Sequence, residues 1–400
     1  MDTINYDDIQ VLVCDDSALM RNLISRIIDS TQGMHSAGTA MNGEFCTNKI
    51  PLLNPDCIIM DIEMPVMNGI EFLKKRKELK IDIPVIMLSS IATSGAGVTM
   101  QCLELGASDF ITKPNGSSVS SDINSVAAKL IEVIASYGGR YARSKNKHVH
   151  HTDFFLSQTK RFEPNQAIET NEQLLQKAQS NLQKINTNSS FTEVQKKVES
   201  VKPLREGGRI EVIAIGISTG GPNALREVFA NIDPQLKQPV LIVQHMPAGF
   251  TKEFAASLNK ICPLEVKEAE DGDIVKGGRV LIAPGDYHIY VEAKALANVV
   301  RLSHDEVRNG HRPSVDVLFE SIASVYENRA LGVIMTGMGR DGAKEITEMR
   351  RQGAWTLGQD EKSSIVYGMP KVAWEMGAIQ KQVSLQDMAK EISLLAKEHA

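Results

Sequence analysis

Two stretches of the chain alternate short apolar runs with helix-length amphipathic segments, and a long polar stretch separates them. This alternation is typical of a parallel β-sheet, because each strand is followed by a crossover helix that packs on one face of the sheet. At 400 residues the chain is long enough for two domains of about 100–200 residues each. The sequence therefore predicts two doubly wound α/β domains joined by a long polar linker.

The first domain is expected over residues 8–137 and contains five apolar runs. The predicted strands are Gln10–Cys14, His35–Ala40, Asp56–Met60, Pro84–Leu88 and Asp109–Ile111. The predicted helices are Ala18–Ser30, Gly69–Leu79, Ala96–Leu105 and Ser121–Ser136. Residues 138–206 are rich in Gln, Asn, Ser and Lys, so we expect them to form a flexible linker.

The second domain is expected over residues 207–400, where the alternation resumes. The predicted strands are Ile210–Ile215, Val240–Val243, Gly278–Ala283, Tyr287–Val291, Leu331–Met335 and Ala354–Leu357. The predicted helices are Asn223–Phe229, Thr251–Asn259, Val315–Tyr326, Asp341–Arg351 and Asp387–Lys397. These runs indicate a second doubly wound sheet, similar to a Rossmann fold.

The composition excludes several classes of protein. A net charge of −5 is not the basic footprint of a nucleic-acid-binding domain, so we expect no nucleic-acid partner. No apolar stretch is long enough to span a bilayer, and the acidic start is unlike a signal peptide, which predicts a cytoplasmic protein without membrane insertion. The five cysteines form no CxxC pair and are expected to be reduced.

Acidic side chains follow two predicted strands of the first domain. Asp15 and Asp16 end the first strand and Asp61 ends the third. One such acid could simply cap a helix, but the carboxyl ends of parallel strands share one edge of a sheet, so all three should meet. Converging carboxylates suit Mg²⁺, and Ser89 and Lys113 add a hydroxyl and a cation at the same edge. This set fits phosphoryl transfer to a carboxylate.

The motifs at this edge resemble those of response-regulator receiver domains, which have a flavodoxin-like fold. The motifs are Val13-Cys14-Asp15-Asp16-Ser17, Asp61-Ile62-Glu63-Met64-Pro65, Asn68-Gly69, Ser89 and Lys113-Pro114. The resemblance implies that Asp61 accepts the phosphoryl group, which Ser89 senses and Lys113 pairs with. It also implies that Mg²⁺ is held by Asp16, Asp61 and the Glu63 carbonyl, with Asp15 acting through water.

A serine, a histidine and an aspartate each lie in a turn after a predicted strand of the second domain. Ser218 lies in a G-x-S-x-G turn, a strand-to-helix elbow that exposes a hydroxyl, although the same glycines could cradle a phosphate in a dinucleotide-type loop. Taken alone, His245 could be structural and Asp341 could be a helix cap. Together, on one sheet edge, the three side chains are the parts of an acyl-transfer site.

The second domain resembles the CheB family of chemotaxis protein-glutamate methylesterases. The resemblance rests on Gly216–Pro222, Val243–Pro247, Gly310–Leu318, Thr336–Gly342, Gln359–Glu361 and Tyr367–Pro370. It implies that Ser218 attacks a glutamyl methyl ester, His245 is the general base and then the acid, and Asp341 orients the imidazole. We place the oxyanion donors at the Thr219 N–H and, second, at the Met338–Gly339 backbone. His311 and Arg312 are expected as possible substrate contacts.

Together these observations predict a phosphorylation-regulated hydrolase that demethylates glutamate methyl esters, and deamidates glutamines, on chemoreceptors during chemotactic adaptation. The expected partners are chemoreceptors as substrate and a chemotaxis histidine kinase as phosphodonor. Mg²⁺ is expected in the receiver, and no cofactor for ester hydrolysis. One alternative is a receiver-regulated phosphate- or nucleotide-binding effector without hydrolysis. The other is a transcriptional regulator, although no helix-turn-helix pattern is visible.

Overall fold

The computed structural model describes residues 8–89, 93–113, 119–147 and 199–400. Both predicted α/β domains lie in one compact unit of the chain. The greater part of the predicted linker, residues 148–198, lies outside the described residues. No helix among the described residues is long and apolar enough to cross a membrane.

The N-terminal domain contains a parallel five-stranded sheet in the order β2-β1-β3-β4-β5. Its strands are β1 (Ile9–Cys14), β2 (Met34–Ala40), β3 (Cys57–Asp61), β4 (Val85–Ser89) and β5 (Asp109–Thr112). Its helices are α1 (Ala18–Asp29), α2 (Gly43–Leu53), α3 (Gly69–Glu78), α4 (Thr93–Glu104) and α5 (Val119–Lys147). The predicted doubly wound arrangement is confirmed.

Alternate residues of β1 explain why this sheet is covered on both faces. Leu12 packs in one cluster with α2, α3 and α4, whereas Val11 and Val13 pack in another with α1 and α5. Helix α2 was not predicted, because its apolar residues are few and Pro51 lies inside it. Its start is nevertheless well marked, since the Asn42 side chain accepts a hydrogen bond from the Phe45 N–H.

Helix α5 extends the N-terminal domain beyond its predicted end at Tyr137. The additional turns are held by side chains, since the Tyr141 hydroxyl donates to Asp82 at 2.8 Å and Lys145 pairs with Asp56 at 3.1 Å. The predicted linker start at Gly138 is therefore wrong, because that residue lies within a helix that reaches Lys147. At the other end of the predicted linker, the Val201 N–H donates to the Gly377 carbonyl at 2.9 Å, so residues 199–206 lie against the C-terminal domain.

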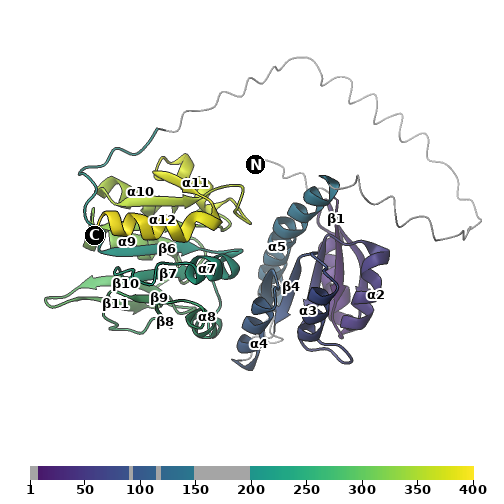
Figure 1. The fold of residues 1–400 in the computed structure, drawn as a ribbon. Coiled ribbons are helices and arrows are strands. Elements are labelled where there is room, and N and C mark those ends of the chain that lie inside the picture. The colour runs from purple at the N-terminus through teal and green to yellow at the C-terminus, as the bar shows by residue number, and fades with distance from the viewer. Residues whose placement is uncertain (1–7, 90–92, 114–118, 148–198) are drawn as a thin grey trace, which may run out of the picture. The chain divides into compact units, whose positions relative to one another are not determined.

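The C-terminal domain contains a parallel seven-stranded sheet in the order β14-β13-β12-β6-β7-β9-β8. Its strands are β6 (Val212–Ile217), β7 (Val240–Gln244), β8 (Glu265–Glu268), β9 (Arg279–Ile282), β12 (Ala330–Ile334), β13 (Trp355–Gln359) and β14 (Lys381–Val383). A separate antiparallel hairpin is made of β10 (His288–Ala293) and β11 (Asn298–Ser303), and it projects from the domain in Figure 1. The run Tyr287–Val291 therefore belongs to this hairpin and not to the main sheet.

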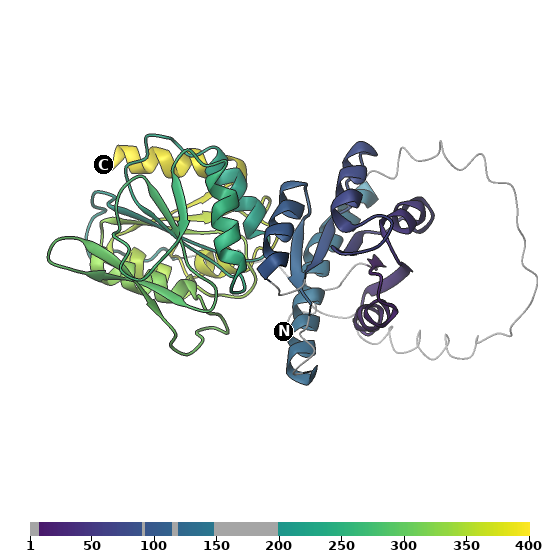
Figure 2. The ribbon, with the colours of Figure 1, turned by 90° about the horizontal axis from the view of Figure 1, so that it is seen from below.

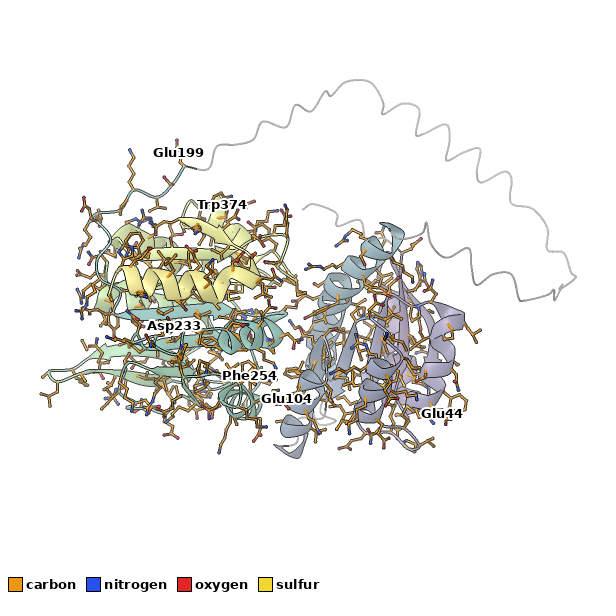
Figure 3. The ribbon with its side chains drawn as sticks, viewed as in Figure 1. Glu44, Glu104, Glu199, Asp233, Phe254 and Trp374 are labelled. Atoms are coloured by element: carbon orange, nitrogen blue, oxygen red, sulfur yellow. The ribbon has the colours of Figure 1, made fainter. Side chains whose placement is uncertain are left out.

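Helices cover both faces of the seven-stranded sheet (Figure 2). They are α7 (Gly221–Ala230), α8 (Phe250–Asn259), α9 (Val315–Tyr326), α10 (Ala343–Gln352), α11 (Met369–Glu375) and α12 (Leu385–Glu398). Ile213 and Ile215 of β6 pack with α7, α8 and α12, whereas Val212 and Ala214 pack with α9, α10 and α11. Phe254 of α8, labelled in Figure 3, is only 1% exposed in the first of these cores.

The strand order fixes where ligands can bind. In each sheet the order reverses beside the first strand, between β1 and β3 and between β6 and β12. Open parallel sheets bind ligands in the crevice at the carboxyl ends of the strands, at such a reversal. Each domain thus has one expected binding edge, and the predicted site residues follow the strands on both sides of it.

Candidate active site

Three neighbouring strands deliver Ser218, His245 and Asp341 to one edge of the C-terminal sheet. Ser218 follows β6 directly and His245 follows β7 directly, while Asp341 lies at the end of the loop after β12. In the sheet these strands are adjacent, in the order β12-β6-β7. The serine therefore lies between the strand that carries the histidine and the strand that carries the aspartate.

The three side chains form a chain of hydrogen bonds. The His245 Nδ1 atom lies 3.1 Å from the Ser218 Oγ atom, and its Nε2 atom lies 2.9 Å from Asp341 Oδ2. An ionised carboxylate can only accept, so Nε2 carries the proton and Nδ1 of the neutral ring is left to accept from the serine hydroxyl. This arrangement fits a serine whose proton is taken by the imidazole.

The Asp341 carboxylate is held by the start of α9. The Val315 N–H and the Ser314 hydroxyl donate to it at 2.6 and 2.7 Å, and the Asn309 side chain donates at 2.8 Å. Burial alone would raise the pKa of Asp341, but the hydrogen bonds from His245, Asn309 and Ser314 lower it well below its usual range. The carboxylate therefore stays ionised at neutral pH, where it can stabilise a positive charge on the imidazole.

The turn around Ser218 requires glycine at two positions. Gly220 has a positive φ of 79°, which favours a residue without a side chain. A Cβ on Gly221 would lie 1.8 Å from the Gln244 Oε1 atom. The Gln244 amide in turn donates to the carbonyls of Ser218 and His245 at 3.1 and 3.0 Å, which ties the two strand ends together.

The candidate oxyanion donors lie next to Ser218. The Ser218 N–H is bonded to the Thr336 carbonyl at 2.9 Å, whereas the Thr219 N–H has no hydrogen-bond partner in the described part of the chain. Met338 and Gly339 line the same cavity of about 590 Å³ as Ser218, Thr219 and His245. The arrangement thus combines a nucleophile, a base and open backbone donors in one cavity.

His311 and Arg312 also line this cavity but are engaged differently. The His311 ring stacks on the His245 ring with a centroid distance of 3.8 Å. The Arg312 guanidinium donates to Asp286 at 2.7 Å and to the carbonyls of His304 and Asp305 at 3.1 and 2.9 Å. Arg312 therefore holds the loop before β10 and the loop after β11 in this structure.

The predicted acidic residues of the N-terminal domain also come together. Carboxylate oxygens of Asp15, Asp16 and Asp61 lie within 4.8 Å of one another. Lys113 lies 2.9 Å from Asp15 and 2.8 Å from Asp61. Burial raises the pKa of the Asp61 carboxyl, and the Lys113 ammonium offsets part of that effect. These hard oxygen donors fit a magnesium ion.

Two further predicted residues lie close to this acidic pocket. Glu63 lines a cavity together with Asp16 and Asn68. The Ser89 hydroxyl lies 2.6 Å from the Thr99 hydroxyl of α4 and is almost fully buried. Ser89 thus connects the end of β4 to α4.

The family models match both domains. The model of the CheB methylesterase matches residues 213–392, and the model of the response regulator receiver domain matches residues 11–120. The chain is also 53% identical to the protein-glutamate methylesterase/protein-glutamine glutaminase of Treponema denticola, over 98% of this chain and all of that protein. The chain belongs to this methylesterase/glutaminase family.

Other relatives agree with this assignment. The protein of the same name from Treponema pallidum is 51% identical over 98% of each chain. Among solved structures, the methylesterase catalytic domain of Thermotoga maritima CheB is similar, with 36% identity, a TM-score of 0.45, and coverage of 47% of this chain and 99% of that one. The two relatives confirm the predicted family, and the two parallel sheets described above confirm the predicted fold class.

The receiver contacts the methylesterase domain beside the candidate nucleophile. Thr219 donates a short hydrogen bond to Glu132 of α5 and accepts one from Lys129 at 2.6 Å. The Gly220 N–H donates to Asp109 of β5 at 3.2 Å. The same cavity that contains Ser218 and His245 is also lined by Lys129 and Glu132. Receiver residues therefore form hydrogen bonds with Thr219 and Gly220, the two residues that follow Ser218.

Sequence reasoning missed the residues that hold Asp341. Asn309 and Ser314 lie far from Asp341 in the sequence, and nothing in their spacing links them to it. The Asn309-Gly310 pair is a turn signal that could have marked this segment. Gln244 lies in the Val243–Pro247 motif, but its residue type alone does not predict its hydrogen bonds to Ser218 and His245.

Proposed function

We propose that the chain hydrolyses methyl esters of glutamate side chains, and deamidates glutamine side chains, on chemoreceptors during chemotactic adaptation. The observation that carries this proposal is the hydrogen-bonded chain from Ser218 through His245 to Asp341 in a cavity of about 590 Å³. Full-length similarity to proteins named for these two activities supports the choice of substrate. Cleavage of either bond is acyl transfer to the serine followed by hydrolysis.

The mechanism follows from the positions of the two imidazole nitrogens. Nδ1 of His245 takes the proton of Ser218 as the hydroxyl oxygen attacks the ester carbonyl, and the charge on the resulting imidazolium is stabilised by Asp341. The oxyanion accepts a hydrogen bond from the Thr219 N–H, with the Met338–Gly339 backbone as a second donor. The imidazolium then protonates the methoxide oxygen, or the amide nitrogen of a glutamine, as its bond to the acyl carbon breaks, so that methanol or ammonia leaves. Water, deprotonated by His245, then attacks the acyl carbon, and the imidazolium returns that proton to the Ser218 Oγ atom as the glutamate is released.

We propose that the receiver is phosphorylated on Asp61 by a chemotaxis histidine kinase. Asp16, Asp61 and the Glu63 carbonyl would hold Mg²⁺, with Asp15 acting through water, and the ion would neutralise charge on the phosphoryl oxygens. The Lys113 ammonium, now paired with Asp15 and Asp61, is within reach of a phosphoryl group on Asp61. Ser89 would sense that group and pass the change to Thr99 of α4.

The first test compares methanol release from methylated receptor membranes by wild type and by Asp61→Asn. Acetyl phosphate with Mg²⁺ is expected to raise the wild-type rate and to leave the Asp61→Asn rate unchanged, because the amide cannot accept the phosphoryl group. Chelating the metal should remove the activation of wild type but not its basal rate. Activation of Asp61→Asn by acetyl phosphate would place the phosphoacceptor elsewhere.

We further propose that the unphosphorylated receiver restrains the methylesterase domain through α5. Glu132 and Lys129 bond the side chain of Thr219, the residue after the nucleophile, and Asp109 takes the neighbouring Gly220 N–H. Phosphorylation would shift the population from this closed arrangement to an open one. A long linker lowers the effective concentration of the receiver at this contact.

Glu132→Ala is expected to raise the basal hydrolysis rate, since it removes one charged partner of Thr219. A hydrogen bond to a charged group contributes about 1.5–3 kcal/mol, so the rate without phosphodonor should rise by about 10-fold or more if closure limits it. Glu78→Ala is the control, because Glu78 is an exposed residue of α3 that pairs with Lys75 of the same helix at 3.2 Å. A basal rate in Glu132→Ala that matches the control would show that this contact does not restrain the enzyme.

We propose domain boundaries that differ from those expected from the sequence. We assign residues 8–147 to the receiver, and 199–400 to the methylesterase domain with its packed N-terminal segment. The intervening residues would be the linker. Deleting the receiver should then be done up to residue 147, because a cut at Tyr137 leaves the last turns of α5 on the remaining chain.

A further inference from the structure

A two-residue turn presents His311 to the active site. Arg308 and His311 exchange backbone hydrogen bonds of 3.1 and 3.0 Å, and the two residues between them, Asn309 and Gly310, have positive φ angles of 54° and 78°. An Asn-Gly pair with both φ angles positive is the favoured two-residue hairpin turn. The Arg308 guanidinium bonds Glu345 at 2.9 Å, which fixes the turn to α10. The backbone of His311 is therefore held firmly.

The side chain of His311 offers its face to the catalytic ring. The two imidazole rings are 3.8 Å apart between centroids and 15° from parallel. Burial, and then repulsion by a charge on His245, lowers the pKa of His311 to about 4, so its ring is neutral at pH 7. Within the described residues the ring nitrogens of His311 have no hydrogen-bond partner. Within the described residues, the stack on His245 is therefore the contact through which the His311 ring can orient another side chain.

The segment that carries His311 also holds the partner of His245. Asn309 precedes the stacking residue by two positions and donates to Asp341 at 2.8 Å. Ser314 and Val315 follow it and donate to the same carboxylate at 2.7 and 2.6 Å. Residues 308–315 therefore contact both the ring of His245 and the carboxylate that orients it.

We propose that His311 is a positioning residue that holds the His245 imidazole in the plane shared by Ser218 and Asp341. The inference rests on the proposed Ser-His-Asp mechanism. In it, His311 acts through the face of its aromatic ring and not through its nitrogen atoms. The hydrogen bonds at Nδ1 and Nε2 lie on opposite sides of the His245 ring and leave it free to tilt about the line joining them. A parallel ring at 3.8 Å opposes that tilt.

Three variants of the full chain separate stacking from substrate contact. His311→Phe keeps an aromatic face without nitrogens, His311→Asn keeps polar atoms without a ring, and His311→Ala keeps neither. Aromatic stacking contributes about 0.5–1.5 kcal/mol, which predicts a loss of kcat of about 2- to 12-fold in Asn and Ala. The Phe variant should keep kcat near that of wild type, and KM should change little in all three.

The variants are measured with acetyl phosphate and Mg²⁺ present, by methanol release from methylated receptor membranes and by the rate of Ser218 inactivation with phenylmethanesulfonyl fluoride. Phenylmethanesulfonyl fluoride has none of the groups of a receptor substrate. The rate of Ser218 inactivation should therefore follow the same order as kcat, with the Phe variant above the Asn and Ala variants. Melting temperatures are compared in parallel, and folded protein is counted by Ser218 titration.

The opposite pattern would overturn the proposal. If Asn keeps activity while Phe raises KM, His311 contacts substrate through its nitrogens. If all three variants match wild type in both assays, the stack has no role in catalysis. A failure of the proposed function itself would look different, because wild type would then release no methanol.

Discussion

Ser218→Ala is expected to abolish methanol release from methylated receptor membranes, with a fall in kcat of about 10⁶-fold, the size seen when the nucleophile of a serine hydrolase is removed. The Oγ atom lies 3.1 Å from His245 Nδ1, where it can donate its proton to the imidazole and attack a carbonyl. The change should leave the fold intact, because Ser218 is held by its backbone N–H to the Thr336 carbonyl, which alanine retains. Phosphorylation of Asp61 should be unaffected.

Ser393→Ala is the matched control. Its hydroxyl donates to the Ala389 carbonyl within α12 at 2.7 Å and accepts from the Asp233 N–H at 3.2 Å, so it bonds to no residue of the proposed site among the described residues. The comparison also tests the rival interpretation of the glycine-rich turn as a phosphate or nucleotide loop. In that case wild type and Ser218→Ala would both lack turnover and would both bind the ligand. Turnover in wild type that persists in Ser218→Ala would exclude Ser218 as the nucleophile.

The sequence was most informative where strands end. A buried parallel strand is a recognisable apolar run, and the residue after it must lie at the carboxyl edge of the sheet. That reasoning predicts that Asp15 lies near Asp61 and that Ser218 lies near His245, as the structure shows. It could not order the strands, because neighbours in the sheet, such as β6 and β12, are far apart in the sequence.

The elements that were missed are short or weakly apolar. Strands β8 and β14 lie at the edges of the seven-stranded sheet and contain charged residues, Glu265 and Lys381 among them, so they lack an apolar run. Helix α5 was cut short because its last turns are polar and are held by contacts with Asp82 and Asp56. Such contacts are tertiary and leave no periodic signal.

The surroundings of the candidate site were also beyond sequence reasoning. Asn309, Ser314 and Val315 converge on Asp341 only because α9 begins beneath the loop that follows β12. The stack of His311 on His245 depends on the turn at Asn309-Gly310. In each case a loop places a side chain across the sheet edge, and the apolar pattern carries no information about loop paths.

Asp341→Asn is expected to lower kcat by about 10⁴-fold, as when a triad carboxylate becomes an amide and the imidazole adopts the wrong tautomer. An amide can present its NH₂ group to His245 Nε2, which favours the tautomer with the proton on Nδ1 and leaves that nitrogen unable to accept the proton of Ser218. Asp316→Asn is the control. Asp316 is buried and accepts hydrogen bonds from the Asn309 side chain at 2.6 Å and from the Gly342 N–H at 3.0 Å. Among the described residues it has no hydrogen bond to His245.

The ionisation of Asp341 and that of Asp316 should affect the stability of the fold in opposite directions as pH changes. Hydrogen bonds lower the pKa of Asp341 below its unfolded value of about 3.9, so its ionised form stabilises the fold above that pH and this contribution is lost as pH falls. Burial raises the pKa of Asp316, so its ionisation opposes folding as pH rises. Asp341→Asn should therefore reduce the melting temperature at pH 7 more than at about pH 2, which lies below the unfolded pKa, and Asp316→Asn should not. Equal losses of activity in the two variants would mean that Asp341 acts only by packing and not by orienting the base.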